Sequence, residues 1–247
     1  MSTTIKSGFL LINKPCGISS YGCIGFLKRI LKQKIKIGHA GTLDPFASGM
    51  LIVALGREAT RLIDHMMVME KTYVATGKCG ELTDTLDLTG TTVITTDVIP
   101  SEQEIRTSLA SFGSSYEQVP PLYSALKHQG SPLYSLVRQN VMSAEQLQEI
   151  AANKRRIVQL YDLQLLSYES PYFTIQACVS HGTYIRTLIN DIAVRAGSCA
   201  TTHQLARTAI GPFNLSQATD LPAINTIEDI NRLIIPVETL ESLITAV

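Results

Sequence analysis

The sequence GHAGTLDPFASGM at residues 38–50 holds three glycines, one histidine and one carboxylate between two apolar segments. Glycine is costly in regular structure and is used where the backbone bends sharply or is closely approached. A residue before proline is driven out of the helical region, so Asp44 is expected on extended or turn backbone with its carboxylate projecting. Taken alone, an Asp-Pro turn of this kind favours an ordinary backbone cap. The whole run predicts a tight loop that presents Asp44 and His39 to a closely approaching molecule.

The full pattern is more specific than an Asp-Pro turn. From residue 38 to residue 51 it resembles, at every defining position, the catalytic motif of the TruB family of tRNA pseudouridine synthases. The Asp of that motif is the family's catalytic residue, so the resemblance implies this role for Asp44. It also implies that His39 fills the space vacated by a flipped base. A general-base role for His39 is less favoured, because the motif holds no second group to orient the ring.

Two more side chains are expected beside the target base. The sequence KTY at residues 71–73 resembles the second family motif, whose Tyr lies against that base, so the resemblance places Tyr73 in the site. Without it, Tyr73 would be interpreted as a core aromatic on a strand. Leu205 matches the family residue that lines the uracil pocket. Ala206 replaces the first of two usual arginines in the same run, which weakens any claim about phosphate contacts there.

The sequence GTYIR at residues 182–186 resembles the third family motif. The resemblance implies that Arg186 pairs with Asp44 and keeps it ionised, and that Tyr184 and Leu205 sandwich the extruded uracil. Tyr184 and Arg186 are two residues apart, which on an extended segment puts both side chains on one face. As a charge at a helix start, Arg186 would oppose the helix dipole, so helix stabilisation explains it poorly.

Two lysines complete the expected substrate contacts. Lys14 belongs to a segment that resembles the family's KP-G-SS opening and is expected to support the motif. Lys127 ends the sequence YSALK, which resembles a family segment near the RNA-binding groove; an ordinary turn into a helix is its alternative. The loop at residues 83–90 resembles the family's TDT-D--G segment. We expect Asx and Thr hydrogen bonds there rather than a metal, with Asp84 pairing a basic group of the site.

Local patterns predict an alternation of short strands and helices. Strands are expected at residues 8–13, 50–55, 156–167 and 173–180, and from residue 71 up to the glycines at 77 and 80. Helices are expected at residues 21–33, 59–67, 101–112 (from a capping box at Ser101 and Glu104), from the third motif to about residue 195, and 226–234. This order is compatible with the fold that the resemblance implies. That fold is α+β, a pseudouridine synthase fold with a mixed, mainly antiparallel sheet flanked by helices and a central active-site groove. We expect one catalytic domain over residues 1–247, without the C-terminal accessory RNA-binding domain of many relatives.

The charge distribution, the length of the apolar runs and the cysteine spacing indicate further properties of the protein. The net charge is zero, yet residues 1–43 carry seven Lys or Arg and no acid. The stretch at residues 28–36 is therefore either a phosphate-binding patch or a solvated helix face, and charge alone does not choose. There is no apolar run near ~20 residues and no signal-peptide core, so a cytoplasmic protein without a membrane partner is expected. The five cysteines lack metal-ligand spacing and are expected as reduced thiols; neither a metal nor another cofactor is expected.

The predicted function is isomerisation of uridine to pseudouridine at position 55 in the T-loop of tRNA, by base flipping and re-formation of the glycosidic bond through C5. A carboxylate suits the departure at C1′, as in glycoside hydrolysis. Attack by Asp44 on C1′, addition to the ring and removal of a sugar proton remain open, with Tyr73 or a water it holds as the base at C5. The expected partner is the T-arm stem-loop of tRNA, bound by a monomer. The alternatives are an RNA-folding factor on the same scaffold, or a nucleoside or glycoside hydrolase, which would need a second carboxylic acid.

Overall fold

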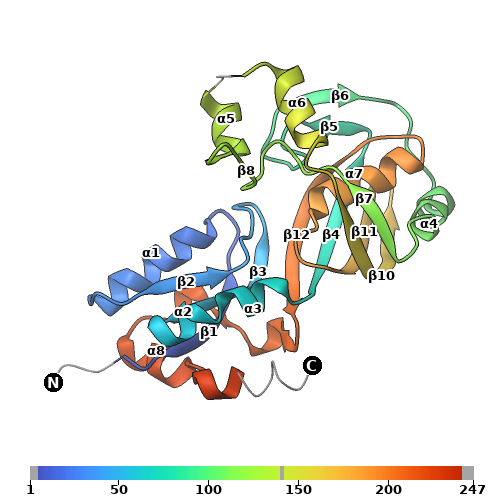
Figure 1. Cartoon of the computed structure of the whole chain (residues 1–247). Helices are drawn as coiled ribbons and strands as arrows, with labels where there is room; N and C mark the ends of the chain where they lie inside the picture. The colour runs from blue at the N-terminus through green and yellow to red at the C-terminus, as the bar shows by residue number, and fades with distance from the viewer. Residues whose placement is uncertain (1–4, 140–141, 241–247) are drawn as a thin grey trace. The chain divides into compact units, whose positions relative to one another are not determined.

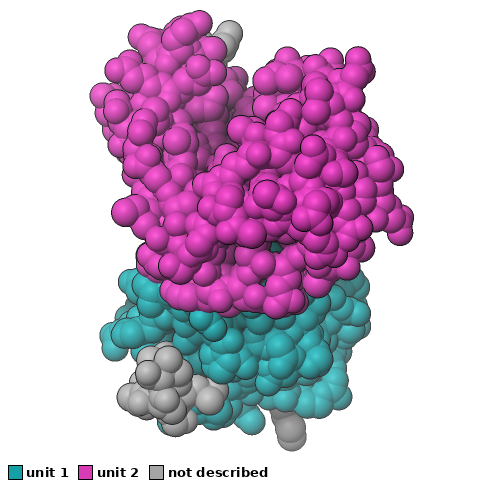
Figure 2. Space-filling view, turned by 90° about the vertical axis from the view of Figure 1, so that its right-hand side faces the viewer, with its two compact units in different colours: residues 1–73, 205–247 teal, residues 74–204 magenta. Residues whose placement is uncertain are grey.

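The computed structural model describes residues 5–139 and 142–240 (Figure 1). The chain divides into two compact units, one made of residues 1–73 and 205–247 and the other of residues 74–204 (Figure 2). The boundary falls inside two strands, β4 (Lys71–Cys79) and β12 (Ala200–Ile210). The fold is α+β with mainly antiparallel strands and flanking helices, as predicted. The assignment of residues 1–247 to one catalytic domain stays a prediction.

The first unit is built around β3 (Ser48–Leu55), which pairs antiparallel with β1 (Gly8–Lys14) and β2 (Ile37–Ala40) and parallel with β12. Short strands β13 (Phe213–Asn214) and β14 (Thr219–Asp220) pair with β12 and β1. Successive side chains of a strand point to opposite faces. Accordingly Leu51, Val53 and Leu55 enter one apolar cluster, and Met50, Ile52 and Ala54 enter another. Both faces of β3 are therefore covered, which explains its continuous apolar sequence.

Helices cover this sheet. Helix α1 (Ser20–Leu31) begins where the Ser19 side chain accepts a hydrogen bond from Gly22 N, and α8 (Ile227–Leu233) begins at a Thr226 capping box. Helices were predicted at both places. The single helix predicted at residues 59–67 is instead two, α2 (Arg57–Arg61) and α3 (Ile63–Val68), because Leu62 N donates to Ala59 O, three residues back, and so interrupts the α-helical pattern of bonds four residues back. Two 3-10 turns, η1 (Leu215–Gln217) and η2 (Leu221–Ala223), precede α8.

The second unit has strands in the order β4-β11-β10-β7, with β10 (Arg156–Glu169) antiparallel to both β11 (Tyr172–Val179) and β7 (Ser115–Gln118). Helices α4 (Glu102–Ala110) and α7 (Ile185–Arg195) pack against each other. Gly77 lies inside β4 rather than at its end. A Cβ there would lie 2.6 Å from Phe173 and 2.8 Å from Ile189, so the glycine permits close packing of β4 against β11 and α7.

Smaller elements complete the second unit: the pairs β5 (Glu81–Thr83) with β6 (Thr92–Thr95) and β8 (Lys127–His128) with β9 (Ser131–Pro132), and helices α5 (Leu133–Gln139) and α6 (Ala144–Ala152). The capping box at Ser101 is present as predicted. All five cysteines are free thiols. In the described parts of the chain, no helix is both long and apolar enough to cross a membrane.

Candidate active site

The loop that carries Asp44 joins β2 to β3 and spans residues 41–47; we call it the motif loop. Asp44 is half-buried on non-helical backbone, as predicted. On its N-terminal side, Leu43 N donates to Ser20 Oγ at 2.9 Å, and Ser20 Oγ donates to Leu43 O at 3.2 Å. On its C-terminal side, Gly17 N donates to Pro45 O at 2.7 Å. The backbone is therefore fixed on both sides of the carboxylate.

Lys14 lies under the motif loop and is fully buried. Its Nζ donates to the carbonyl oxygens of Pro15 at 2.9 Å, Ile18 at 2.7 Å and Pro45 at 3.3 Å. Burial lowers the pKa of Lys14, while nearby thiols and the Asp44 carboxylate oppose that shift. An ammonium has three donors, and here backbone carbonyls use all three. The geometry gives Lys14 a bracing role; its predicted contact with substrate stays a prediction.

Arg207 ties the motif loop to the strand that follows it. Its guanidinium is buried, with Nε donating to Met50 O at 2.8 Å and Nη2 to Gly41 O at 3.0 Å. Gly49 has φ +105°, and a Cβ there would lie 2.3 Å from Arg207 O. Only glycine allows this strained backbone and this close approach between β3 and β12.

His39 lies on β2, opposite Val53, and is half-buried. Its Nδ1 is buried, and no hydrogen-bond partner for it exists among the described residues. Burial, followed by the charge of Arg207, lowers the pKa of His39, so the imidazole is neutral at pH 7. A neutral ring with no orienting partner suits stacking better than proton transfer.

Tyr73 and Leu205 lie at the ends of the two segments that make up the first unit. Tyr73 is on β4 and Leu205 on β12, and both side chains are buried. Lys71, two residues before Tyr73, donates to the carbonyls of three residues at the end of α3, which are Met66, Met67 and Met69. Burial, followed by the charge of Arg207, lowers the pKa of Lys71 to about 8. Lys71 therefore anchors the start of β4.

The third motif lies in the second unit, and its local structure differs from the prediction. Helix α7 begins at Ile185, so Arg186 lies in its first turn rather than on an extended segment with Tyr184. The predicted shared face of an extended segment is therefore wrong. Tyr184 is the N-cap residue and is half-buried, whereas Arg186 is 3% exposed. Arg186 is thus a buried cation and not a surface charge.

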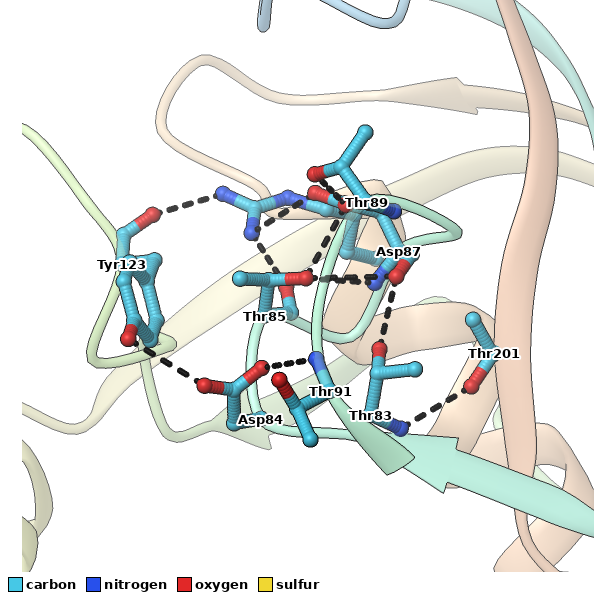
Figure 3. Close-up of polar contacts among 9 residues, drawn as sticks. Thr83, Asp84, Thr85, Asp87, Thr89, Thr91, Tyr123 and Thr201 are labelled. Carbon is cyan, nitrogen blue, oxygen red and sulfur yellow. Dashed lines mark hydrogen bonds and ion pairs between the residues drawn. The ribbon is translucent and has the colours of Figure 1, made fainter. Parts of the chain in front are cut away.

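Arg186 contacts a polar network that includes Thr85, Asp87 and Tyr123, which Figure 3 labels. Its Nη1 donates to Thr85 O and lies 3.5 Å from Asp87 Oδ2, and its Nη2 donates to Tyr123 O at 2.8 Å. The same carboxylate accepts hydrogen bonds from Thr85 Oγ1 at 2.9 Å and from both N and Oγ1 of Thr89. A buried charge is tolerated only when it is paired and hydrogen-bonded, and both partners here meet that condition.

The loop at residues 83–90 is held by Asx and Thr hydrogen bonds, as predicted, but its ion pair belongs to Asp87. Asp84 is exposed and accepts from Tyr123 OH at 3.2 Å and from Thr91 N at 2.8 Å (Figure 3). The expected pairing of Asp84 with a basic group is therefore wrong. No cluster of potential metal ligands is found among residues 5–139 and 142–240.

The TruB family pseudouridylate synthase (N terminal domain) model matches residues 28–185, which is more than half of the chain. The chain belongs to the TruB family. A relative from Syntrophotalea carbinolica named tRNA pseudouridine synthase B is 42% identical over 88% of this chain and 68% of its own length. One of the same name from Bordetella avium is 41% identical over 90% of this chain and 88% of its own length. The crystal structure of a Cbf5-Nop10-Gar1 complex contains a similar chain, with a TM-score of 0.68 and 28% identity. That match covers 94% of this chain and 60% of the other.

The TruB motifs are divided between the two units. Asp44, His39, Tyr73, Leu205 and Lys14 belong to the first unit, and Tyr184, Arg186 and Lys127 to the second. Lys127 is exposed on β8 of a short hairpin, not at a helix start. The roles assigned to these residues from the TruB pattern are taken up below as proposals.

Sequence reasoning missed the residues that brace the TruB motifs: Arg207, Lys71 and Asp87. Each is a charged side chain that is nearly fully buried. Arg207 follows Ala206 in the matched family run, and Asp87 lies in the matched loop, so both were visible as motif positions. The carbonyl partners of Arg207 and the guanidinium partner of Asp87 belong to distant segments, which no local pattern reveals. The carbonyl partners of Lys71 lie two to five residues away.

Lys14→Met is expected to destabilise this TruB chain by about 2–4 kcal/mol, because it removes a fully buried charged donor and leaves three partly buried carbonyl hydrogen bonds unmade. Methionine keeps most of the side-chain volume, so packing changes little. Urea unfolding of both proteins measures the difference in the free energy of unfolding. Lys28→Met, at an exposed position of α1, is the matched control and should change stability by less than about 0.5 kcal/mol. Equal effects of the two substitutions would contradict the bracing role.

Proposed function

We propose that this chain isomerises uridine to pseudouridine at position 55, in the T-loop of tRNA. The observation that carries the proposal is the motif loop, which holds Asp44 half-buried with its backbone hydrogen-bonded on both sides. Relatives about 40% identical over most of the chain are named tRNA pseudouridine synthase B. We propose further that the enzyme acts as a cytoplasmic monomer. The assembly of Cbf5 with Nop10 and Gar1 is a property of that protein.

The reaction breaks the bond between N1 and C1′, turns the uracil and forms a bond between C5 and C1′. The C5 proton leaves and N1 gains a proton, so atoms and electrons balance without an oxidant or reductant. Asp44 supplies the carboxylate that attacks C1′, adds to the ring or removes a sugar proton, and Tyr73, or a water that it holds, receives the C5 proton. Free tyrosine has a pKa near ~10, so a relay through water suits it better than direct proton abstraction.

The target base must leave the RNA stack, at a cost of a few kcal/mol. In the proposal, His39 fills the space that the base vacates, Tyr184 and Leu205 sandwich the uracil, and Arg186 pairs with Asp44. Lys127, exposed on its hairpin, contacts the RNA backbone. The buried network around Arg186 supports this assignment, since it holds the guanidinium in one orientation. Lys14 supports the motif loop from below.

His39→Phe is expected to retain activity, whereas His39→Ala is expected to lose about 10-fold to 100-fold in turnover, because stacking on a base is worth about 1–3 kcal/mol. The buried Nδ1 makes no hydrogen bond among the described residues, so a carbon can replace it at little cost. Turnover on a T-arm transcript at saturating RNA is the measurement. If the phenylalanine variant is as slow as the alanine variant, His39 acts through its nitrogen and the stacking role is wrong.

The basic stretch at residues 28–36 is expected to contact phosphates. Its five cations are exposed, and none of the ion pairs among the described residues involves them: Lys28, Arg29, Lys32, Lys34 and Lys36. Replacing the last three together by Gln should flatten the dependence of log Kd on log salt by about 0.7–0.9 for each phosphate that the variant no longer neutralises. A triple Gln variant of the ion-paired Arg106, Arg155 and Arg232 removes the same charge and is the control. If the wild type and the Lys variant show the same slope of log Kd against log salt, the basic stretch at residues 28–36 is a solvated surface that binds no phosphate.

The proposed function is tested by tritium release from a tRNA transcript labelled at uracil C5, with the product position mapped. Release, together with pseudouridine at the T-loop uridine, is the expected result. Release of free uracil or activity on a free nucleoside would favour the hydrolase, which needs a second carboxylic acid. Tight tRNA binding without release would favour an RNA-folding factor and overturn the proposal.

A further inference from the structure

The side chain of Gln118, the last residue of β7, forms two hydrogen bonds with the backbone of Tyr184. Gln118 is 1% exposed. Its Oε1 accepts from Tyr184 N at 2.8 Å, and its Nε2 donates to Tyr184 O at 3.0 Å. The side-chain amide thus pairs with both polar backbone groups of one residue, as a neighbouring strand would. Tyr184 is the N-cap residue of α7, and its side chain makes no capping hydrogen bond, so Gln118 supplies the side-chain contact that holds this residue.

The partners of the amide set its orientation. A backbone N–H can only donate and a backbone carbonyl oxygen can only accept, so Oε1 faces Tyr184 N and Nε2 faces Tyr184 O. An amide nitrogen carries two hydrogens, and Gln118 Nε2 also donates to Tyr116 OH. Contacts with two residues therefore hold the amide in place.

The ring of Tyr184 is held from the same place. Arg156 pairs with Gln118 in the register of β10 and β7, and its guanidinium carbon lies 5.0 Å from the centroid of the Tyr184 ring. A cation at this distance from an aromatic ring is attracted to its face. Gly182 has φ +80°, and a Cβ there would lie 3.0 Å from Arg156 Nη1. One end of the β7–β10 pair thus contacts both the backbone and the ring of Tyr184.

We propose that Gln118 is a positioning residue for pseudouridine formation, which acts by fixing the Tyr184 ring against the extruded uracil. The inference rests on the proposed function and adds a residue to it. Tyr184 O also accepts a hydrogen bond from Leu188 N at 3.0 Å. The residue that Gln118 holds is therefore bonded to the first turn of α7, where Arg186 lies. Displacing a stacking ring by about 1 Å can cost on the order of 100-fold in rate without loss of binding.

The first test compares Gln118→Leu with Ser108→Ala. Ser108 is buried on α4 and donates at 2.7 Å to Ile192 O, which lies about two turns further along α7 than Tyr184. Gln118→Leu should slow single-turnover pseudouridine formation at saturating T-arm RNA by about 10-fold to 100-fold, with the Kd for RNA changed less than about 3-fold. Ser108→Ala should leave the rate within about 2-fold, although it also removes a buried hydrogen bond to α7. Equal rates for wild type and Gln118→Leu would overturn the proposal.

A double-mutant cycle separates positioning from simple stabilisation. If Gln118 acts through Tyr184, adding Gln118→Leu to Tyr184→Leu should slow the reaction little further, whereas a purely structural effect should multiply. Multiplying effects in folded proteins would therefore overturn the proposal. Should Gln118→Leu fail to fold, Tyr116→Phe removes only the hydroxyl that accepts from the Gln118 amide, and the same double-mutant cycle with Tyr184→Leu tests the proposal. A wild type that forms no pseudouridine would refute the proposed function itself, whereas an active wild type with a multiplicative cycle refutes only the role of Gln118.

Discussion

Asp44→Asn is expected to lower tritium release from uracil C5 by at least about 10⁴-fold, because removal of an essential reacting group typically costs this much or more. Asparagine keeps the shape of the side chain but removes the charge needed at C1′ or at the ring. The motif loop should keep its conformation, since Ser20, Lys14 and Gly17 hold it through backbone groups of Leu43 and Pro45. The Kd for a T-arm transcript should therefore change less than about 10-fold, one step of 1.4 kcal/mol.

The matched control for this experiment is Asp64→Asn. Asp64 lies in the first turn of α3, in the same unit, and is exposed, so it loses the same charge away from the motif loop. Its rate should equal that of the wild type. Tritium release by Asp44→Asn at near wild-type rate would mean that another group supplies the carboxylate chemistry. A loss of RNA binding in parallel with the rate would instead indicate a binding role.

Asp87→Ala is expected to destabilise the protein by about 3–5 kcal/mol, because removing one partner of a buried ion pair leaves the other charge poorly compensated. The substitution removes the carboxylate 3.5 Å from the Arg186 guanidinium and the acceptor for Thr85 and Thr89. The loop at residues 83–90 should lose its internal order at the same time. The measurement is the free energy of unfolding from urea titration, together with hydrogen exchange at Thr89 N.

The contrast with Asp84→Ala makes this prediction specific. Asp84 lies in the same loop and also accepts two hydrogen bonds, but it is exposed and pairs with a neutral hydroxyl and a backbone amide. Its replacement should cost about 1 kcal/mol or less, as expected of an exposed hydrogen bond. If the two alanine variants are equally stable, the Arg186–Asp87 pair contributes no more than an exposed polar contact.

Local chemistry explains which parts of the fold could be predicted. Ser19, Ser101 and Thr226 mark helix starts because a side chain caps the backbone within three residues, and all three caps are present. The boundary between α2 and α3 at Leu62 has no such signal in the sequence, because no glycine or proline lies in the segment predicted as one helix. The helical start at Ile185 was missed because the residue before it, Tyr184, carries no side-chain cap and is held by Gln118, 66 positions away.

The residues of the candidate site likewise fall into those that the local sequence predicts and those that it does not. Asp44 could be named from the sequence because a turn before proline and the surrounding glycines are local properties. The placement of Lys14 and Arg207 could not, because their partners are backbone carbonyls up to 166 positions away. From sequence alone, a lysine or arginine is expected on the surface, because such residues are rarely buried without partners. Only the folded chain shows which carbonyls make burial possible.

The first unit is discontinuous in the chain, and this sets an order for its assembly during synthesis. Strand β1 near the N-terminus pairs with Thr219 and Asp220, and Phe9 exchanges backbone hydrogen bonds with Ile235. The ribosome must therefore make all of residues 74–204 before those partners exist. The second unit, a single continuous segment, can fold while the N-terminal strands wait. Until residues 205–240 emerge, the apolar side chains of β1 lack part of their cover, so transient contacts or chaperones must keep the nascent N-terminal segment from aggregating.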